Sequence, residues 1–355
     1  MRCLVTGGAG FIGSNLVRHL LSSGHYVLNV DALTYAGNAQ SLSDIKSSGQ
    51  YRFVRMDIAN DSGLAGVFDD YRPDCVLHLA AESHVDRSID GPGQFIETNI
   101  VGTYQLLQAS LGYFRGLDLE HRDRFRFLHV STDEVFGSLG AEGYFSEDTA
   151  YDPHSPYSAS KAASDHLVRA WWHTYGLPVL ITNCSNNYGP YQFPEKLIPV
   201  VILKCIRNES IPVYGRGENV RDWLYVMDHC KAIETVVERG RVGQTYTVGG
   251  NNEMKNIDLV RALCRIMDSL RPRAGGGRYE ELITYVADRP GHDMRYAIDA
   301  SKLKWELGWE PDSDHESLLT ATVRWYLDNE TWWQSILSGE YKLERQGLST
   351  GKESS

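Results

Sequence analysis

The stretch that decides the fold reads TGGAGFIG, Thr6–Gly13, and it directly follows a short apolar run, Arg2–Val5. Its glycines have the spacing G-x-x-G-x-x-G, and a helical pattern begins immediately after them. Glycine permits a tight turn and a close approach of the backbone to a diphosphate, whose charge is stabilised by free N–H groups at a helix N-terminus. The pattern therefore predicts a dinucleotide site, and a purely structural tight turn is the alternative. The predicted contacts are Gly7, Gly10, Phe11, Ile12 and Gly13.

Outward from this stretch, short β-branched runs alternate with helical patterns through the first half of the chain. Strand, helix and strand in this order favour a parallel sheet covered on both faces, because right-handed crossovers place the helices there. We predict an α/β fold with a doubly wound, Rossmann-like parallel sheet and a smaller mixed α/β substrate-binding domain. The predicted strands are Arg2–Val5, Tyr26–Val30, Tyr51–Met56, Cys75–Leu79, Phe125–Val130 and Val179–Asn183, and the predicted helices are Ile12–Ser22, Phe95–Phe114 and Tyr157–Tyr175.

The alternation loosens after about residue 185, which indicates a second, less regular unit. A helical stretch, Val226–Arg239, and a strand-like run, Gln244–Val248, are expected to return to the main sheet. We therefore predict interleaved domains. Residues 1–185 form the dinucleotide-binding domain, with 222–250 returning to it; residues 186–221 and 251–340 form the substrate-binding domain; and residues 348–355 form a disordered tail.

The composition is that of a packed protein, because 42% of the 355 residues are hydrophobic and 23% are charged. The net charge of −11 opposes non-specific binding to nucleic acid or an anionic membrane. No leader precedes the first strand, and the longest apolar run is about half the ~20 residues that span a bilayer, so a cytoplasmic protein is expected. The six cysteines are scattered and no His cluster has metal-ligand spacing, which predicts reduced thiols and no metal site.

An acidic residue, Asp31, ends the second predicted strand, about twenty residues after the glycines. A carboxylate there accepts hydrogen bonds from both hydroxyls of an adenine ribose and repels a 2′-phosphate. The next residues, Ala32–Thr34, include no Arg or Lys, so NAD is favoured over NADP. Asp57 and Ile58 end the third strand, where they would border the adenine; for Asp57, a strand-end carboxylate satisfied by its neighbours is an equal alternative.

Tyr157 and Lys161 lie four residues apart, on one face of a helix predicted to begin near Pro156. A cation near a phenol favours the phenolate, so Lys161 is expected to lower the pKa of Tyr157 from about 10. The pair can then take a proton from an alcohol while a nicotinamide accepts the hydride. Alone, Y-x-x-x-K is equally typical of a surface helix pair. The functional interpretation is favoured here because the glycine stretch lies upstream and Ser131 and Thr132 end the preceding strand.

Two adjacent carboxylates, Asp133 and Glu134, follow that strand, where strand C-termini border the ligand. Adjacent side chains of a strand point to opposite faces, so the backbone must leave β geometry near Asp133 for both to reach one substrate. Oxidation of a sugar carbinol acidifies the neighbouring C–H, after which one carboxyl can remove that proton while the other protonates a departing hydroxyl. Taken without this context, an acidic pair at a strand end is usually a solvated turn or a helix cap.

With these motifs, the chain resembles the extended short-chain dehydrogenase/reductases and, within them, the dTDP-glucose 4,6-dehydratase family. The resemblance covers the chain from its start to about residue 335. The matching segments are Thr6–Gly13, Leu33–Asn38, Leu79–Ser88, Thr98–Thr103, Ser131–Gly137, Tyr157–Lys161, Asn183–Tyr191, Arg221–Val226 and Asp288–Asp293.

The resemblance implies NAD as the cofactor and a role for each residue of the centre. Tyr157 is implied as the base toward the C4 hydroxyl, Lys161 as a ligand of the nicotinamide ribose, and Thr132 as a hydrogen-bonding partner of the sugar O4. Glu134 would take the C5 proton and Asp133 would protonate the leaving C6 hydroxyl. Hydride then returns to C6 and gives dTDP-4-keto-6-deoxyglucose from dTDP-glucose.

The resemblance also implies the remaining contacts. Thr98 and Ser131 are implied as further cofactor contacts. Because the protein is otherwise acidic, the cations Lys196 and Arg221 are suited to bind the diphosphate of the ligand. For Pro212 and Tyr214, ordinary packing is an equal alternative. The implied substrate-binding residues are Ser83, Asn186, Lys196, Leu197, Pro212, Tyr214, Arg221, Asn256 and His292.

A homodimer is implied by the same resemblance, through two long helices that here correspond to Phe95–Phe114 and Pro156–Tyr175, with Trp171 and Trp172 as contributors. Two other functions stay open. A nucleotide-sugar 4-epimerase needs the Tyr and Lys pair but no acid and base for elimination, so the two adjacent carboxylates argue against it. A non-catalytic NAD-binding regulatory module need not keep these groups together.

Overall fold

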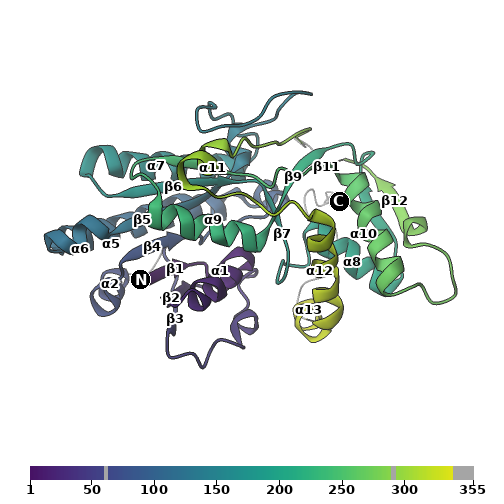
Figure 1. Cartoon of the computed structure of the whole chain (residues 1–355), viewed down its shortest axis with the longest axis horizontal. Helices are drawn as coiled ribbons and strands as arrows, with labels where there is room; N and C mark the ends of the chain where they lie inside the picture. Colours follow the sequence, from purple (N-terminus) through teal and green to yellow (C-terminus); the bar gives the residue numbers. More distant parts are fainter. Residues whose placement is uncertain (60–62, 289–292, 339–355) are drawn as a thin grey trace, which may run out of the picture.

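The computed structural model describes residues 1–59, 63–288 and 293–338. Seven parallel strands form the central sheet: β1 (Arg2–Thr6), β2 (Tyr26–Asp31), β3 (Tyr51–Arg55), β4 (Cys75–His78), β5 (Arg126–Thr132), β6 (Val179–Cys184) and β10 (Thr245–Val248). Their order across the sheet is β10-β6-β5-β4-β1-β2-β3. This order confirms the doubly wound parallel fold that the sequence predicts, and Figure 1 shows its part from β6 to β3.

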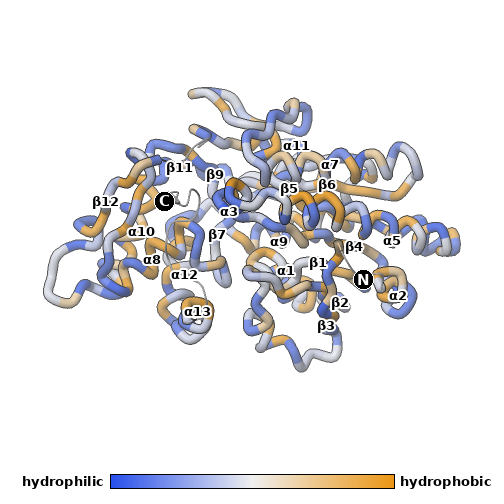
Figure 2. The backbone as a smooth tube through the Cα atoms, turned by 180° about the vertical axis from the view of Figure 1, so that it is seen from behind, coloured by the Kyte–Doolittle hydropathy of each residue, from blue (hydrophilic) through white to orange (hydrophobic). Residues whose placement is uncertain are grey.

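Helices cover both faces of this sheet (Figure 1). On one face, α1 (Phe11–Ser22) packs beside α9 (Val226–Arg239), and the other face is covered by α2 (Leu64–Tyr71), α5 (Thr103–Gly116) and α7 (Pro156–Tyr175). Alternate residues of β1 serve the two layers, because successive side chains of a strand point to opposite faces. Cys3 and Val5 pack with α1 and α9, while Leu4 packs with the other layer. Figure 2 shows the resulting hydrophobic interior along β5 and β6.

The helix predicted over Phe95–Phe114 is not one regular α-helix. A short helix, α4 (Pro92–Phe95), leads into a π-helical segment, η2 (Ile96–Gly102), and only then does α5 begin. The side chain of Asn99 accepts from the backbone N–H of Glu82 (2.8 Å) and donates to its carbonyl (3.0 Å) and to Ser160 Oγ (2.8 Å). These three bonds join the π-helical segment to the loop after β4 and to α7. Such π-helical turns are frequently found at functional sites.

The second half of the chain builds a smaller lobe, seen on the right in Figure 1. Its core is a hydrophobic cluster separate from the two that flank the large sheet. The lobe contains a three-stranded sheet of β7 (Asn186–Tyr188), β9 (Val220–Tyr225) and β11 (Glu253–Lys255), and a two-stranded sheet of β8 (Ile211–Tyr214) and β12 (Ile283–Val286). Its main helices are α8 (Leu197–Arg207), α10 (Asn256–Leu270), α12 (His315–Asp328) and α13 (Glu330–Leu337).

The remaining short elements are η1 (Ala39–Leu42), α3 (Val85–Asp90), α6 (Leu119–Arg124), η3 (Asp133–Phe136), η4 (Tyr279–Leu282) and α11 (Ser301–Leu307). After α9 the chain returns to the large sheet, where β10 pairs in parallel with β6. The exact domain boundaries stay a prediction, and the expected tail 348–355 lies outside the described residues.

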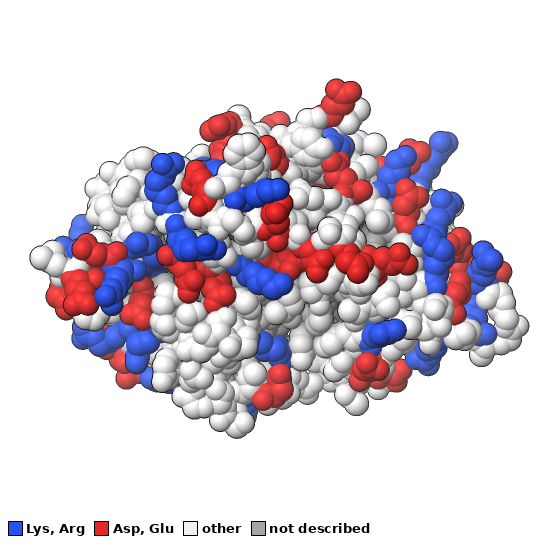
Figure 3. Space-filling model, viewed as in Figure 1, with Lys and Arg blue, Asp and Glu red and all other residues white. Residues whose placement is uncertain are grey.

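The surface agrees with the mixed, acidic composition. Acidic and basic side chains are interspersed over the face shown in Figure 3. All six cysteines are buried and free, as predicted. Among the described residues, no helix combines the length and the apolar character that a membrane span requires.

Candidate active site

A cavity of about 310 Å³ opens at the carboxyl ends of the central strands. Its wall includes the turn after β1 and the residues that end β2, β5 and β6. From β1 the chain proceeds to β2 and β3 on one side, whereas β4, β5 and β6 lie on the other. Ligands of open α/β sheets bind at such a switch point, so the topology and the cavity indicate the same site.

The turn between β1 and α1 requires its glycines. Gly7 has φ +73°, and a Cβ there would lie 2.7 Å from the backbone N of Ala80; a Cβ on Gly13 would lie 2.1 Å from the carbonyl oxygen of Gly7. Gly10 caps α1 without a side-chain hydrogen bond, so no side chain competes for the first N–H groups of the helix. A cradle that any Cβ would fill, in front of a helix N-terminus, fits the diphosphate of a dinucleotide.

The carboxylate of Asp31 is fixed at the end of β2. Its two oxygens accept hydrogen bonds from the backbone N–H groups of Ala9 and Leu33, both at 2.8 Å. Burial raises the pKa of Asp31 and outweighs these two bonds, which lower it. Each oxygen keeps a further lone pair, so the carboxylate can also accept from ribose hydroxyls. All predicted cofactor contacts line the cavity: Gly7, Gly10, Phe11, Ile12, Gly13, Asp31, Asp57, Ile58, Thr98 and Ser131, with Tyr157 and Lys161.

The helix α7 carries Tyr157 and Lys161 into the cavity wall. A capping box between Ser155 and Ser158 starts the helix, with Pro156 in its first turn. The Nζ of Lys161 donates to the carbonyl oxygen of Val130 at 2.8 Å. Burial lowers the pKa of Lys161 to about 8. The first turn of α7 is thus fixed by its cap and the ammonium by the end of β5.

The predicted lowering of the pKa of Tyr157 is wrong for the chain as it stands. Burial and the charge of Glu134 raise the pKa of Tyr157 well above 10, although a hydrogen bond with Thr132 lowers it. The phenol is almost fully buried, and removal of water disfavours the phenolate more strongly than the sequence-based argument allowed. The spacing on the helix correctly predicted that Tyr157 and Lys161 lie in one cavity wall. It could not predict how burial and charge together set the pKa of Tyr157.

The two adjacent carboxylates follow β5 in the way the sequence requires. The strand ends at Thr132, and the 3₁₀ turn η3 begins at Asp133, so the predicted departure from β geometry is confirmed. The Oγ1 of Thr132 accepts from the backbone N–H of Glu134 (3.3 Å) and donates to Oδ1 of Asp133 (3.2 Å). Both carboxylates line the cavity with Thr132 and Tyr157.

Asp133 is prepared to carry a proton. Burial, followed by the charges of Glu134 and Asp222, raises the pKa of Asp133 well above its ordinary value. Its Oδ2 is buried without a hydrogen-bond partner among the described residues. A protonated carboxyl in this position is a donor, so the arrangement can deliver a proton to a leaving group.

A buried pair beneath Lys161 was missed by the sequence analysis. The Oδ2 of Asp165 accepts from Ser131 Oγ (2.9 Å) and Tyr151 OH (2.8 Å), and its Oδ1 lies 3.2 Å from Nε2 of His129. The same His129 nitrogen lies 3.4 Å from Nζ of Lys161. Burial alone would raise the pKa of Asp165, but the hydrogen bond and charge of His129 and the charge of Lys161 outweigh it and lower the pKa. The buried carboxylate of Asp165 therefore favours the charged form of Lys161 and opposes the effect of burial on its pKa.

The signal for this pair is present in the sequence. Asp165 lies one helical turn after Lys161, so the two share a face of α7. His129 lies two residues before Ser131, on the same face of β5. Periodicity alone could not show that this face is sealed from water.

The wall also contains two buried carboxyl groups that were not singled out, Glu82 and Glu195. Burial raises the pKa of each. Tyr35 donates to Glu195 at 3.3 Å, and the guanidinium of Arg87 lies 3.6 Å from the centre of the Tyr35 ring. Glu82 and Ser83 belong to the matching segment Leu79–Ser88, where only Ser83 was selected.

The predicted substrate residues divide into three groups. Ser83, Asn186 and Lys196 line the cavity. The other described ones, Leu197, Pro212, Tyr214, Arg221 and Asn256, are not among the residues that line it. His292 lies outside the described residues. These assignments stay predictions.

The two predicted diphosphate partners are in different surroundings. Lys196 Nζ donates to the carbonyl oxygen of Ser83 at 3.3 Å, at the cavity wall. Arg221 is buried; its guanidinium donates to the carbonyl oxygens of Val220 (2.7 Å) and Asp293 (2.9 Å) and lies 4.1 Å from the centre of the Tyr296 ring. Of the two cations, only Lys196 therefore reaches the cavity surface here.

Comparisons with known proteins agree with this site. A family model described as GDP-mannose 4,6 dehydratase matches residues 4–322. A dTDP-glucose 4,6-dehydratase of Xanthomonas campestris pv. campestris (strain B100) is 60% identical over 344 residues, which cover 97% of this chain and 98% of that protein. The chain belongs to the dTDP-glucose 4,6-dehydratase family. The resemblance seen in the sequence is thereby confirmed.

Solved structures of the dTDP-glucose 4,6-dehydratase family have the same fold. The dTDP-glucose 4,6-dehydratase DesIV of Streptomyces venezuelae was solved with NAD and a second ligand bound. It has a TM-score of 0.85 and 44% identity, and the match covers 95% of this chain and 100% of that chain. A UDP-glucose 4-epimerase of Thermotoga maritima, solved with UDP-glucose, has a TM-score of 0.82 but only 28% identity. The match covers 93% of this chain and 100% of that chain. Because the fold is shared by both activities, the site residues have to distinguish them.

Proposed function

We propose that the protein is an NAD-dependent lyase that dehydrates dTDP-glucose to dTDP-4-keto-6-deoxyglucose. The observation that carries the proposal is η3, which places Asp133 and Glu134 in one cavity wall with Thr132 and Tyr157. Elimination of water needs an acid and a base in addition to the group that accepts the C4 hydroxyl proton. Two of the proteins named above, those of Xanthomonas campestris and Streptomyces venezuelae, are dTDP-glucose 4,6-dehydratases, and the second was solved with NAD bound, which supports the proposal.

Each side chain of the cavity wall has its own role in the proton transfers of the reaction. Tyr157 takes the proton of the C4 hydroxyl, and Thr132 donates to or accepts from the sugar O4. Glu134 removes the C5 proton, and Asp133, whose pKa is raised, gives its proton to the C6 hydroxyl, which leaves as water. When bound, NAD supplies the acceptor of the C4 hydride, the donor of the hydride to C6 and a positively charged ring that opposes the effect of burial on Tyr157. Glu134 returns its proton to C5 when C6 receives the hydride, and the proton that Tyr157 gains from O4 balances the one that Asp133 gives to the leaving hydroxyl. The substrate therefore loses one H₂O and the cofactor ends in its starting oxidation state.

The glycine cradle, the carboxylate of Asp31 and the position of Lys161 support NAD as the cofactor. Ala32–Thr34 include no cation that could bind a 2′-phosphate, which favours NAD over NADP. In the smaller lobe, we propose that residues 186–221 and 251–340 bind the nucleotide sugar, with Lys196 at the diphosphate.

The direct test is turnover of dTDP-glucose, measured by the alkali-induced absorbance of a 4-keto-6-deoxy sugar. UDP-glucose and GDP-glucose, assayed in parallel, are expected to react more slowly. An epimerase would instead give a galactose-configured product without that absorbance, and a regulatory module would bind NAD and turn over none of the three sugars. Either result would overturn the proposal.

We also propose that the protein is a cytoplasmic homodimer. Exposed apolar side chains lie on the two expected helices: Ile96 on η2, Tyr104 on α5 and Tyr175 on α7. Trp171, expected to contribute, is almost fully buried within the chain, where it packs against Tyr104 and Tyr175. Sedimentation should give twice the chain mass, and substitution of Ile96 and Tyr104 by Glu should give the monomer.

A further inference from the structure

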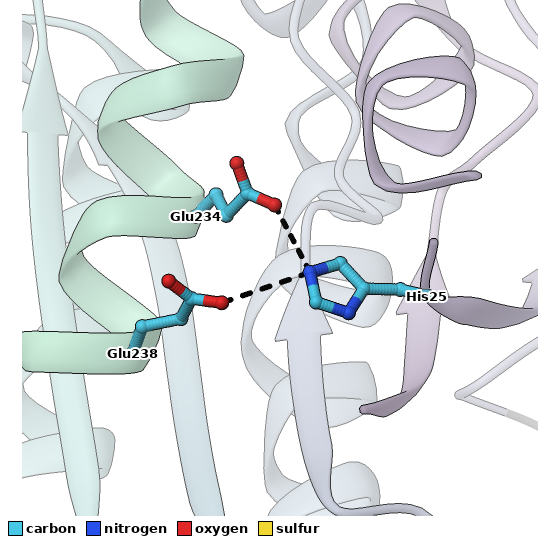
Figure 4. Close-up of side chains that lie close together, drawn as sticks. All are labelled: His25, Glu234 and Glu238. Carbon is cyan, nitrogen blue, oxygen red and sulfur yellow. Dashed lines mark hydrogen bonds and ion pairs between the residues drawn. The ribbon is translucent and has the colours of Figure 1, made fainter. Parts of the chain in front are cut away.

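A cluster of imidazole and carboxylate groups lies at the opposite edge of the central sheet from the cavity. His25 directly precedes β2, so it lies at the amino end of that strand, whereas Asp31 and the cavity are at the carboxyl end. Glu234 and Glu238 come from consecutive turns of α9, and Figure 4 shows both carboxylates reaching the same ring nitrogen of His25. The members of this cluster, called here the amino-edge cluster, are His19, His25, Glu234 and Glu238.

The distances within the amino-edge cluster suit one metal ion. Nε2 of His25 lies 3.0 Å from Oε1 of Glu234 and 3.7 Å from Oε1 of Glu238, and the ligand atoms of these residues all lie within 4.8 Å of one another. Two ligand atoms that are each about 2.1 Å from a tetrahedral zinc ion lie about 3.4 Å apart. The two observed distances bracket that value, so small side-chain rotations bring the three donors around one centre.

The fourth group supports the first three. Nε2 of His19 lies 2.7 Å from Oε2 of Glu234, which is the oxygen that does not contact His25. Metal-binding carboxylates are commonly held by such an outer partner. The side chains of His19, His25 and Glu234 are 14%, 11% and 18% exposed, whereas that of Glu238 is 41% exposed. An ion can therefore enter past Glu238, and water can complete its coordination.

The charges of α9 favour a cation here. Glu234 and Glu238 are at i and i+4, where like charges repel, and they lie toward the C-terminal end of the helix, where the helix dipole is negative. Nδ1 of His25 lies 3.1 Å from the amino group of Met1.

We propose that His25, Glu234 and Glu238 bind one divalent transition-metal ion, with His19 as a positioning residue that holds Glu234. Imidazole together with carboxylate suits Zn²⁺ in preference to Mg²⁺ or Ca²⁺. The ion would join the start of β2 to α9, across 209 residues of sequence, at the edge of the sheet away from the chemistry. Its role is to stabilise the folded chain, because a ligand that binds only the folded state raises its stability.

The test uses the untagged, full-length protein with NAD, first dialysed against EDTA. Calorimetric titration with Zn²⁺ is expected to give one site per chain, with Mn²⁺ binding more weakly and Mg²⁺ not at all. X-ray absorption of the zinc-loaded protein should show nitrogen and oxygen ligands without sulfur, which excludes binding to the six cysteines. The thermal midpoint should rise on addition of Zn²⁺.

Variants identify the ligands. His25→Ala should abolish binding, Glu238→Gln should weaken it while leaving the His25–Glu234 contact, and His19→Ala should weaken it about tenfold. The matched control is His121→Ala, because His121 forms an exposed imidazole–carboxylate pair with Asp118 elsewhere on the surface. It should bind Zn²⁺ as the parent does.

Two outcomes would overturn the proposal. The first is no binding of Zn²⁺ at concentrations up to about ten times that of the protein. The second is binding that His25→Ala and Glu238→Gln leave unchanged. The side chain of Glu238 is 41% exposed, so Glu238→Gln is expected to fold even if His25→Ala does not.

Discussion

The two edges of the central sheet carry two clusters of titratable side chains that differ in their access to water. At the carboxyl edge, Asp133, Tyr157 and Lys161 are almost fully buried, and burial is the largest influence on the pKa of each. In the amino-edge cluster, Glu238 is 41% exposed and the histidines contact carboxylates near the surface. Burial adjusts a group for proton transfer, whereas access to solvent is what permits an ion to enter. Changes at the two edges should therefore have separable effects.

The largest effect is expected for Tyr157→Phe at the carboxyl edge. Removal of the hydroxyl removes the proton acceptor for the C4 hydroxyl, and a positioned acid or base contributes about 10²- to 10⁴-fold to rate. We expect kcat to fall about 10³-fold while NAD stays bound. Single-turnover formation of reduced nicotinamide measures this step. Undiminished turnover would remove the assigned role, and an unchanged thermal midpoint would show that the loss is chemical.

The next effect is expected for Glu134→Gln, which keeps the shape of η3 but removes the base. C4 oxidation should continue, while product formation falls about 10²-fold because the C5 proton is no longer removed. In ²H₂O, the recovered sugar should contain no deuterium at C5. Exchange at the parental rate would show that another group removes this proton. Asp133→Asn is the matched variant, because it should retain C5 exchange and block only the loss of the C6 hydroxyl.

The contrast between the edges also explains what the sequence could predict. Gly7, Asp31 and the Tyr157–Lys161 pair were found because strand ends, glycine spacing and helical periodicity are local signals. The π-helical segment over Ile96–Gly102 was not found, because it depends on hydrogen bonds of Asn99 to residues from two other elements. Local patterns predict which residues face a cavity, but not how tertiary contacts reshape a helix.

The amino-edge cluster was missed for a related reason. The sequence predicted no metal site, since no histidines have ligand spacing along the chain. His25 and Glu234 meet only because β2 and α9 are brought together by the fold. The direction of the pKa shift of Tyr157 was wrong because burial, which a sequence does not show, outweighs the expected effect of a cation.

A smaller effect is expected for Asp165→Asn, which changes a positioning residue beneath Lys161. Burial lowers the pKa of Lys161 to about 8, and the charge of Asp165 opposes that lowering. Without this charge the pKa of Lys161 falls further. As pH rises, the ammonium of the variant therefore loses its proton at a lower pH than that of the parent. We expect the alkaline limb of kcat/KM to move to lower pH, with about a tenfold loss at neutral pH. A variant that is only less stable would lose activity at every pH without moving this limb.

The smallest effect on turnover is expected at the amino edge, for Glu238→Gln. Glu238 lies near the end of α9, and the cavity is at the other end of the strands, so kcat and KM should stay within about twofold of the parent at saturating NAD. The same variant should lose the rise in thermal midpoint that Zn²⁺ gives. Measured together, these two results separate the edges, because a change that affects stability without affecting chemistry locates the cluster outside the reaction. If Glu238→Gln instead lowered kcat as much as Asp165→Asn does, α9 would transmit changes across the sheet, and the two edges could not be treated as independent.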